Sequence, residues 1–308
     1  MGNTLDGLQH RPCPVCDQDD ADAHWSKGPL QLVQCRACGM VYADPIASSL
    51  TSGAFYHELA QPFYLSREKL ESDYASVRFA RELRLFRAYC RQGRVLDVGC
   101  STGAFLYQLA QRWPGSYETL GTDIATEALD YAASRGVAVA RESFLAYQPA
   151  EAFDAITFWA VLEHLAAPRR FLAKAAQLLK TGGYCFILVP NFRSLAVRLL
   201  GRRYRYILVE HVNYFNVTTL ERFVATESTL RVVNLDSTHF NPVVLWQDWR
   251  KPCERVPDNE RAHLLARTTA WKQNRLLAPL RWLYQGTEKL LGRLRLADNL
   301  VVVLQKKS

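Results

Sequence analysis

Residues 95–103 combine a carboxylate with two glycines at a spacing that predicts ligand binding. The segment reads Val-Leu-Asp-Val-Gly-Cys-Ser-Thr-Gly, an apolar stretch that runs into a turn containing Gly99 and Gly103. Glycine lets the backbone turn sharply and approach a ligand without a Cβ in the way, and the helix expected next presents free N–H groups at the same edge. Asp123 follows twenty residues after Gly103, where a carboxylate can accept both hydroxyls of a ribose.

The spacing of the glycines separates two classes of nucleotide ligand. Dinucleotide-binding turns carry three glycines in the pattern G-x-G-x-x-G, whereas this turn has only Gly99 and Gly103, and Asp97 precedes it. A carboxylate at that point would repel a pyrophosphate and attract the amino group or sulfonium region of S-adenosylmethionine (SAM). The pattern therefore favours SAM, and the alternative is a tight strand-to-helix turn that binds no ligand.

Four of the eight cysteines form a second pattern with chemical meaning. Two residues separate Cys13 from Cys16 and Cys35 from Cys38, and eighteen residues lie between the two pairs. Two thiolate pairs of this kind satisfy tetrahedral Zn²⁺ and leave no open position, so the expected zinc is structural and the alternative is a set of unrelated buried cysteines. With few basic residues for nucleic acid, the module is expected to pack on the main domain or to shape the substrate entrance.

Alternating strand and helix patterns position the glycine turn. The pattern predicts an α/β fold, a doubly wound and mostly parallel sheet with helices on both faces. The expected strands are 94–98, 117–122, 137–140, 155–159, 184–189, 231–235 and 299–305. The expected helices are 68–91, 103–112, 126–135, 168–179, a basic segment 193–205, and 218–226 with Thr218 as N-cap.

The same patterns divide the chain into three parts. Residues 10–45 form the expected zinc-ribbon module, and residues 46–92 are a connector with an N-terminal helix. Residues 93–308 are the expected SAM-binding domain, and a helical insertion at about 241–297 precedes the last strand. We therefore expect one large domain with a small appended module.

Three segments resemble motifs of class I SAM-dependent methyltransferases. Residues 95–103 resemble the first motif of that family, 153–165 its fourth-strand region, and 178–183 its turn into the fifth strand. The resemblance implies a Rossmann-like seven-stranded sheet with an antiparallel last strand. Together with the zinc ribbon, it is similar to bacterial sugar, glycan and natural-product methyltransferases. Ser101 stands where the family usually has glycine, and a serine is expected to fit there with a negative φ.

The resemblance also implies cofactor contacts at particular positions. The residues of the first motif would line the methionine half of SAM, namely Asp97, Gly99, Cys100, Ser101 and Gly103. After the next strand, Asp123 would bind the ribose and Ile124 the adenine, and Ser143 and Phe144 would also contact the adenine. Trp159 and Ala160, at the end of the fourth strand, would face the reactive side of the cofactor. A core aromatic is an equally good interpretation of Trp159.

Residues 210–215 resemble the Glu-His…Tyr-Phe segment of the zinc-bearing sugar methyltransferases. The resemblance implies that His211 acts as a general base, that Glu210 orients it or binds a hydroxyl, and that Tyr214 contacts the acceptor. The alternative is that His211 is a structural histidine, the role expected for His164. No Asn/Asp-Pro-Pro-Tyr/Phe motif follows the fourth strand, which disfavours methylation of exocyclic amines on bases.

The formal net charge of +8 suits a negatively charged partner. Basic residues concentrate in 193–205 and 263–296. These helices either present a solvated basic face, or contact an anionic membrane through 263–296, or bind nucleic acid, in that order of preference. With no apolar run of about 20 residues and no leader-like N-terminus, we expect a cytoplasmic protein that can be peripheral at the inner membrane surface.

Taken together, the residues and the resemblance predict a SAM-dependent methyltransferase with a structural zinc. The expected reaction is O- or C-methylation of a small-molecule, sugar or glycan/lipid-linked acceptor. The alternatives are an RNA or protein methyltransferase that uses the basic segment as a lid, and a non-catalytic SAM-fold interaction scaffold.

Overall fold

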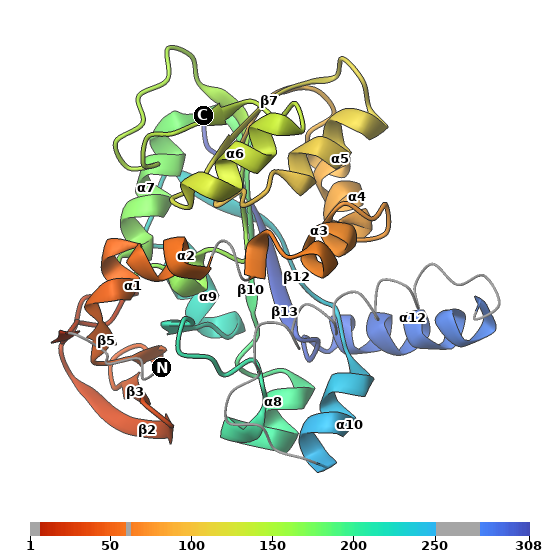
Figure 1. Ribbon diagram of the computed structural model, residues 1–308. Helices are drawn as coiled ribbons and strands as arrows, with labels where there is room; N and C mark the ends of the chain where they lie inside the picture. The colour runs from red at the N-terminus through yellow and green to blue at the C-terminus, as the bar shows by residue number, and fades with distance from the viewer. Residues whose placement is uncertain (1–6, 60–62, 251–277) are drawn as a thin grey trace.

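A seven-stranded sheet lies at the centre of the computed structural model, which describes residues 7–59, 63–250 and 278–308 (Figure 1). The strand order is β12-β13-β10-β9-β6-β7-β8. The strands are β6 (Gly93–Val98), β7 (Tyr117–Thr122), β8 (Val139–Ala140), β9 (Phe153–Trp159), β10 (Leu179–Pro190), β12 (Leu230–Thr238) and β13 (Asn299–Lys306). β13 runs antiparallel to both of its neighbours, whereas β6 to β10 pair in parallel. The predicted doubly wound, mostly parallel sheet is confirmed.

Helices cover both faces of this sheet, because the side chains of its central strands are apolar on both sides. On one face, Leu96 and Ile156 pack in a core cluster with residues of α7 (Pro168–Leu178) and α9 (Val217–Val224). On the other face, Val95, Ala155 and Phe186 pack with α4 (Ala80–Tyr89) and α5 (Ala104–Arg112). The remaining helices are α1 (Ser48–Ser52), α2 (Ala54–Leu59), α3 (Arg67–Asp73), α6 (Thr126–Ser134), α8 (Leu195–Leu200), α10 (Pro242–Arg250) and α12 (Ala278–Arg293), with 3₁₀ turns η2 (Leu162–His164) and η3 (Gly201–Arg203).

The cysteine-bearing N-terminal segment forms a second, antiparallel sheet. Its strands are β2 (Ala21–Lys27), β3 (Leu30–Cys35) and β4 (Val41–Ala43), in the order β11-β4-β3-β2. The outer strand β11 (Asn213–Tyr214) comes from far along the chain and pairs with β4. A short pair, β1 (Leu8–Gln9) with β5 (Ile46–Ala47), completes the segment. The ribbon sheet and the segment 210–215 are therefore parts of one hydrogen-bonded structure.

Several local predictions are wrong. The helix expected over 68–91 is two helices, α3 and α4, and the Tyr74 side chain at their break donates a hydrogen bond to the Thr102 carbonyl at 2.5 Å. Helix α9 begins after Asn216, not Thr218: the Asn216 side chain accepts from the Thr219 amide at 3.1 Å, and the Thr219 hydroxyl oxygen accepts from the Asn216 amide. The basic segment 193–205 contains only α8 and η3, and the strand expected at 137–140 is limited to β8.

The insertion before the last strand is helical where the structure describes it, in α10 and α12. Residues 263–277 of the basic segment predicted to contact a membrane lie outside the described residues. Among the described helices, none has both the length and the apolar character that crossing a bilayer requires.

Candidate active site

A cavity of about 1090 Å³ opens at the carboxyl ends of the central strands. The glycine turn after β6 and the segments that follow β7, β9 and β10 all contribute side chains to its wall. Pockets for one small ligand usually measure about 300–1,000 Å³, so this space can hold a nucleoside-sized ligand and a second small molecule together. Open α/β sheets bind their ligands at this edge.

Packing within the protein requires the two glycines of the turn, in addition to any need for ligand access. Gly99 has a φ of 71°, and a Cβ built there would lie 2.6 Å from the nearest atom of Val161. Gly103 has a φ of 76° and packs beneath α5 against Ala132 and Val137. Unlike the other predicted cofactor residues, Gly103 does not line the cavity. In this structure its visible role is to close the strand-to-helix turn, and its cofactor contact stays a prediction.

Ser101 lies in the left-handed region, with a φ of 49°, so the expected negative φ is wrong. A non-glycine residue in that region costs roughly 1–2 kcal/mol. The Ser101 amide donates a hydrogen bond to Asp123 Oδ2 at 2.8 Å, which ties the turn to the end of the neighbouring strand. The strain is thus coupled to the placement of the Asp123 carboxylate.

Two carboxylates face the cavity from the adjoining strands β6 and β7. Asp97 is buried, and burial, opposed by a 2.6 Å hydrogen bond from Thr157 and reinforced by the nearby Asp123, raises the pKa of Asp97 to about 7. Burial also raises the pKa of Asp123, although the Ala125 and Ser101 amides donate hydrogen bonds to it. Both carboxylates would gain from a ligand that supplies positive charge or hydrogen-bond donors.

An apolar wall lies next to Asp123. Ile124, Ser143 and Phe144 all line the cavity there, and the Phe144 ring stacks on Phe171 with centroids 5.6 Å apart. Trp159 lines the cavity as well as packing edge-on against Phe105 at 5.3 Å. Both interpretations of Trp159, core aromatic and cavity wall, therefore apply to the same side chain.

The opposite end of the wall holds a group of ionisable side chains. His211 is buried, and its ring lies edge-on to that of His164, with centroids 4.8 Å apart. The His164 Nδ1–H donates to the Glu210 carbonyl at 2.9 Å, which leaves Nε2 of the neutral ring as an acceptor. Burial raises the pKa of Glu163 to about 8. Donor atoms of Glu163, His164 and His211 all lie within 4.8 Å of one another, close enough to pass a proton or to hold a cation.

The segment 210–215 is held in place from two sides. The Val212 amide donates to the Glu163 carbonyl at 2.7 Å, and the Val212 carbonyl accepts from the Ala43 amide in the ribbon sheet at 2.9 Å. The Asn213 side chain donates to the Leu162 and Leu165 carbonyls and accepts from Arg11 at 2.7 Å. Since these partners come from the ribbon and from the loop after β9, the ribbon positions the ionisable end of the cavity.

Sequence reasoning placed most of these residues together and missed others. Asp97, Gly99, Cys100, Ser101, Asp123, Ile124, Ser143, Phe144, Trp159, Ala160, Glu210, His211 and Tyr214 all line the cavity. The Tyr214 hydroxyl donates to the Leu208 carbonyl at 2.8 Å, which holds the segment, and its contact with the acceptor stays a prediction. Glu163, Tyr56 and Arg78 also line the cavity and were not anticipated. The adjacency of Glu163 to His164 after the fourth strand was the available signal for Glu163.

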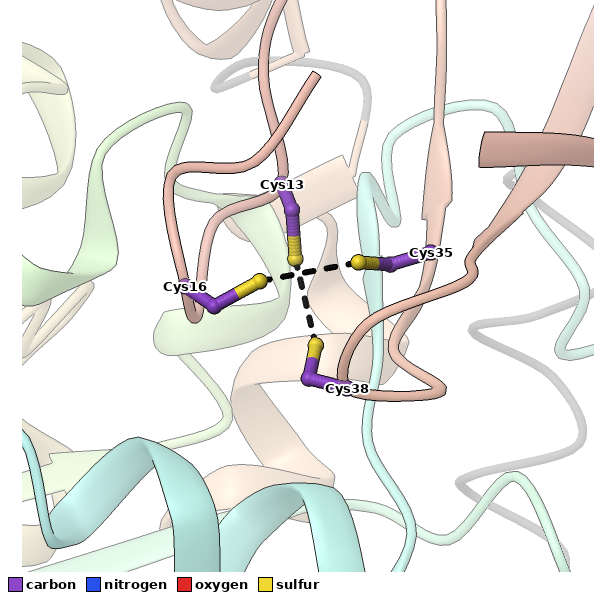
Figure 2. A group of neighbouring side chains, drawn as sticks. All are labelled: Cys13, Cys16, Cys35 and Cys38. Atoms are coloured by element: carbon purple, nitrogen blue, oxygen red, sulfur yellow. Dashed lines mark hydrogen bonds between the residues drawn. The ribbon is translucent and has the colours of Figure 1, made fainter. Parts of the chain in front are cut away.

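The four cysteines of the ribbon converge on one point (Figure 2). Cys13 and Cys38 Sγ atoms lie 3.4 Å apart, those of Cys16 and Cys35 lie 3.5 Å apart, and all four lie within 4.8 Å of one another. These distances exclude disulfides, which need about 2.05 Å, and are close to the separation of about 3.8 Å expected around tetrahedral Zn²⁺. Burial raises the pKa of Cys13 to about 11, an effect that a bound cation would reverse. The donor set fits zinc.

Comparisons with known proteins agree with this geometry. A family model described as a methyltransferase domain matches residues 70–233. The ubiquinone biosynthesis O-methyltransferase of Burkholderia pseudomallei is 30% identical over 166 residues, covering 49% of this chain and 69% of that protein. The protein of the same name from Azoarcus sp. is 29% identical over 166 residues, with the same coverage. A SAM-dependent methyltransferase structure from Thermotoga maritima, described as a possible histamine N-methyltransferase, shares the fold, with a TM-score of 0.51, 15% identity and coverage of 82% of this chain and 99% of that chain.

Proposed function

Because the chain belongs to the methyltransferase-domain family and is a SAM-dependent methyltransferase, we propose that it O-methylates a hydroxylated small-molecule, sugar or glycan/lipid-linked acceptor. The pair of carboxylates at the ends of β6 and β7, Asp97 buried and Asp123 half-buried, is the observation that carries the proposed cofactor site. The O-methyltransferase names of the curated relatives favour oxygen over carbon as the acceptor atom. RNA and protein acceptors are the alternative outcomes of an acceptor screen.

SAM fits this wall of the cavity group by group. Asp97 faces the site at which the cofactor ammonium would lie, and Asp123 the ribose hydroxyls. Ile124 and Phe144 offer apolar surface for the adenine ring. When bound, SAM supplies the activated methyl group.

His211 is the proposed general base. In the displacement, the acceptor oxygen forms a bond to the methyl carbon while the carbon–sulfur bond breaks, and the hydroxyl proton passes to His211. Glu210, beside it, is proposed to bind or orient the acceptor hydroxyl, and Tyr214 holds the segment from beneath. Aromatic side chains on the cavity wall, such as Tyr56 and Phe192, exclude water from the reacting atoms.

The ribbon is proposed to hold one structural Zn²⁺ through Cys13, Cys16, Cys35 and Cys38. With four protein ligands, the metal has no position for substrate. Its proposed contribution is to hold β4 in the place where β11 pairs with it.

A screen with methyl-labelled SAM and extracts fractionated into small molecules, glycolipids, RNA and protein tests this function. We expect label in a small-molecule or glycan fraction, attached to oxygen. Label only in RNA or protein would overturn the acceptor class, and a carbon-bound label would overturn O-methylation.

SAM affinity is expected to depend on pH through Asp97. Its pKa is raised to about 7 in the free protein, so at pH 6 most molecules must lose this proton before the carboxylate can pair with the cofactor ammonium. The dissociation constant for SAM should therefore fall by up to about tenfold between pH 6 and 7.5. Calorimetry at several pH values measures this. Burial raises the pKa of the neighbouring Asp123 as well, so Asp97→Asn serves as the control and should flatten the profile; an unchanged profile in that variant would contradict the assignment.

Membrane contact is a proposal that rests on exposed side chains. On α10, Trp246 and Trp249 are 53% and 66% exposed beside Arg250, and Leu294, which directly follows the last residue of α12, Arg293, is 58% exposed. Tryptophan with arginine suits the interface of an anionic bilayer. The full chain should float with vesicles containing phosphatidylglycerol and not with vesicles of pure phosphatidylcholine. The double substitution Trp246→Ala plus Trp249→Ala should reduce flotation with the phosphatidylglycerol vesicles. Equal flotation with both vesicle types would contradict an anionic contact.

A further inference from the structure

The cavity extends beyond the cofactor wall into a polar lobe, formed by Tyr204, Glu82, His239 and Asp298. All four residues line the cavity. Within the part of the chain that the structure describes, Glu82 Oε2 and His239 Nδ1 are buried polar atoms without a hydrogen-bond partner, and the Tyr204 side chain hydrogen-bonds that of Asp298 next to them. Buried polar atoms are nearly always paired in native proteins, so the two unpaired atoms beside this pair mark a place where a polar ligand binds.

The lobe is rigid and charged. Glu82 is only 6% exposed, and its Oε1 lies 3.2 Å from His239 Nε2. Burial opposes ionisation of Glu82, but His239 and Arg78 outweigh it and lower the pKa of Glu82 to about 2. His239 has a φ of 63°, a conformation that side chains rarely adopt, and such strain concentrates at functional sites. Asp298 is held by the Asn241 amide, which donates to its Oδ2 at 3.0 Å.

The lobe offers hydrogen-bond acceptors in excess. Glu82 and Asp298 contribute carboxylate oxygens, which accept hydrogen bonds, and His239 already directs its Nε2 at Glu82. The cations nearby are engaged elsewhere: Lys69 and Arg78 pair with Asp73, and Arg81 pairs with Glu288. A ligand that completes this lobe must bring several donors at once, as vicinal hydroxyl groups do.

The sheet order separates Asp298 from the two carboxylates proposed to bind the cofactor. The strands β7, β6, β9, β10 and β13 are successive neighbours, and each contributes residues to the cavity at or near its end on this edge. Asp97 lies in β6 and Asp123 follows β7, the group of Glu163 and His211 adjoins the end of β9, and Asp298 precedes β13. An acceptor reaching from His211 to Asp298 would have its reactive hydroxyl at one end and its other hydroxyls in the lobe.

We propose that Glu82, His239 and Asp298 form a specificity subsite that binds the hydroxyl groups of a polyhydroxylated, sugar-like acceptor, with Tyr204 adding its hydroxyl. The inference rests on the proposed methyltransferase function and names its acceptor class. The three residues hold the acceptor in position and do not touch the methyl group that is transferred.

The test uses the full chain and labelled SAM with defined probes. Methyl glucoside, myo-inositol and uridine diphosphate glucose are hydroxyl-rich, glucosamine carries an ammonium group, and 3,4-dihydroxybenzoate is a flat aromatic. We expect methylation of at least one hydroxyl-rich probe. Glu82→Gln and Asp298→Asn should each raise its KM at least tenfold, with kcat and SAM affinity changed less than threefold.

Tyr204→Phe tests the subsite with a small substitution that is expected to fold. It removes one buried hydroxyl that hydrogen-bonds the Asp298 side chain, so a purely structural role predicts lower stability with unchanged KM, whereas the subsite predicts a raised KM in a variant that still folds. Tyr117→Phe, whose hydroxyl donates to the Cys90 carbonyl outside the cavity, is the matched control and should leave KM unchanged.

Two failures can be told apart. If the wild-type chain binds no SAM, the proposed function itself fails. If it binds SAM but ignores every hydroxyl-rich probe, prefers the flat aromatic or the ammonium probe, or shows the same KM after Glu82→Gln and Tyr204→Phe, the subsite is overturned.

Discussion

Replacing His211 with alanine should leave SAM affinity within about threefold of the wild-type value and reduce turnover by about 10²- to 10⁴-fold, the usual contribution of a positioned general base. The His211 imidazole is buried in the cavity wall, and its ring lies edge-on to that of His164. His164 in turn donates a hydrogen bond to the carbonyl of Glu210, the residue before His211. Without His211, the acceptor loses the base proposed to take its proton, and His164, whose Nδ1 is engaged by the Glu210 carbonyl, is expected to replace it only poorly. Single-turnover kinetics with labelled SAM measure the loss, and calorimetry measures cofactor binding.

Two further measurements separate chemistry from structure at His211. Imidazole added to the His211→Ala variant should restore part of the turnover if the lost group is a base, and should do nothing if the histidine only packs the segment. His10→Ala is the matched control, because His10 is exposed and lies in the ribbon, away from the cavity. Turnover equal to wild type in His211→Ala would remove His211 from the mechanism.

Loss of the zinc site should be nearly as damaging, although the metal is not near the reacting atoms. Cys38→Ser removes one of four thiolates, and binding of a structural zinc supplies roughly 10–16 kcal/mol of folding free energy in isolated zinc fingers. Without the bound zinc, we expect β4 to lose its pairing with β11. The buried Arg11–Asn213 hydrogen bond, which anchors the segment 210–215, should then weaken. We expect turnover to fall at least 100-fold while SAM affinity changes less than about threefold, since Asp97 and Asp123 belong to the central sheet.

Metal analysis and hydrogen exchange check this prediction. The wild-type chain should contain one zinc and Cys38→Ser less, and amides of residues 212–214 should exchange faster in the variant. Cys90→Ala is the matched control, because Cys90 is a buried cysteine far from the four-thiolate group in sequence and packs in a different core cluster. A zinc-free variant with wild-type turnover would show that the ribbon does not position the acceptor site.

The cavity wall proposed to bind the cofactor was predictable as a structure because its signals are local. The apolar stretch, the glycine turn and Asp97 lie within nine residues, and strand–helix alternation places Asp123 at the adjoining strand end. Buried strands with apolar residues on both faces leave few other folds for such a pattern. The conformation of Ser101 was not predictable, because its positive φ depends on a hydrogen bond to Asp123 in a different strand.

The acceptor half depends on contacts between distant segments, which single-sequence patterns do not contain. The pairing of β11 with β4 joins Asn213 to Tyr42, and two-residue strands have no periodicity to detect. The break between α3 and α4 follows from Tyr74 reaching Thr102, a contact that helical periodicity cannot report. The polar lobe joins Glu82 of α4 to His239 and Asp298 near the ends of β12 and β13, and each residue alone has no motif around it.

The central claim, that the carboxylates at the ends of β6 and β7 hold SAM, is tested most directly by calorimetric titration of SAM into the wild-type chain and Asp123→Ala. Asp123 would accept two ribose hydroxyls, and hydrogen bonds to a charged group contribute about 1.5–3 kcal/mol each. We therefore predict saturable one-to-one binding by the wild type, weakened about 100-fold in Asp123→Ala, and unchanged in Asp130→Ala, a matched loss of an exposed carboxylate on α6. Wild-type protein that does not bind SAM, or Asp123→Ala that binds it equally well, would contradict the account.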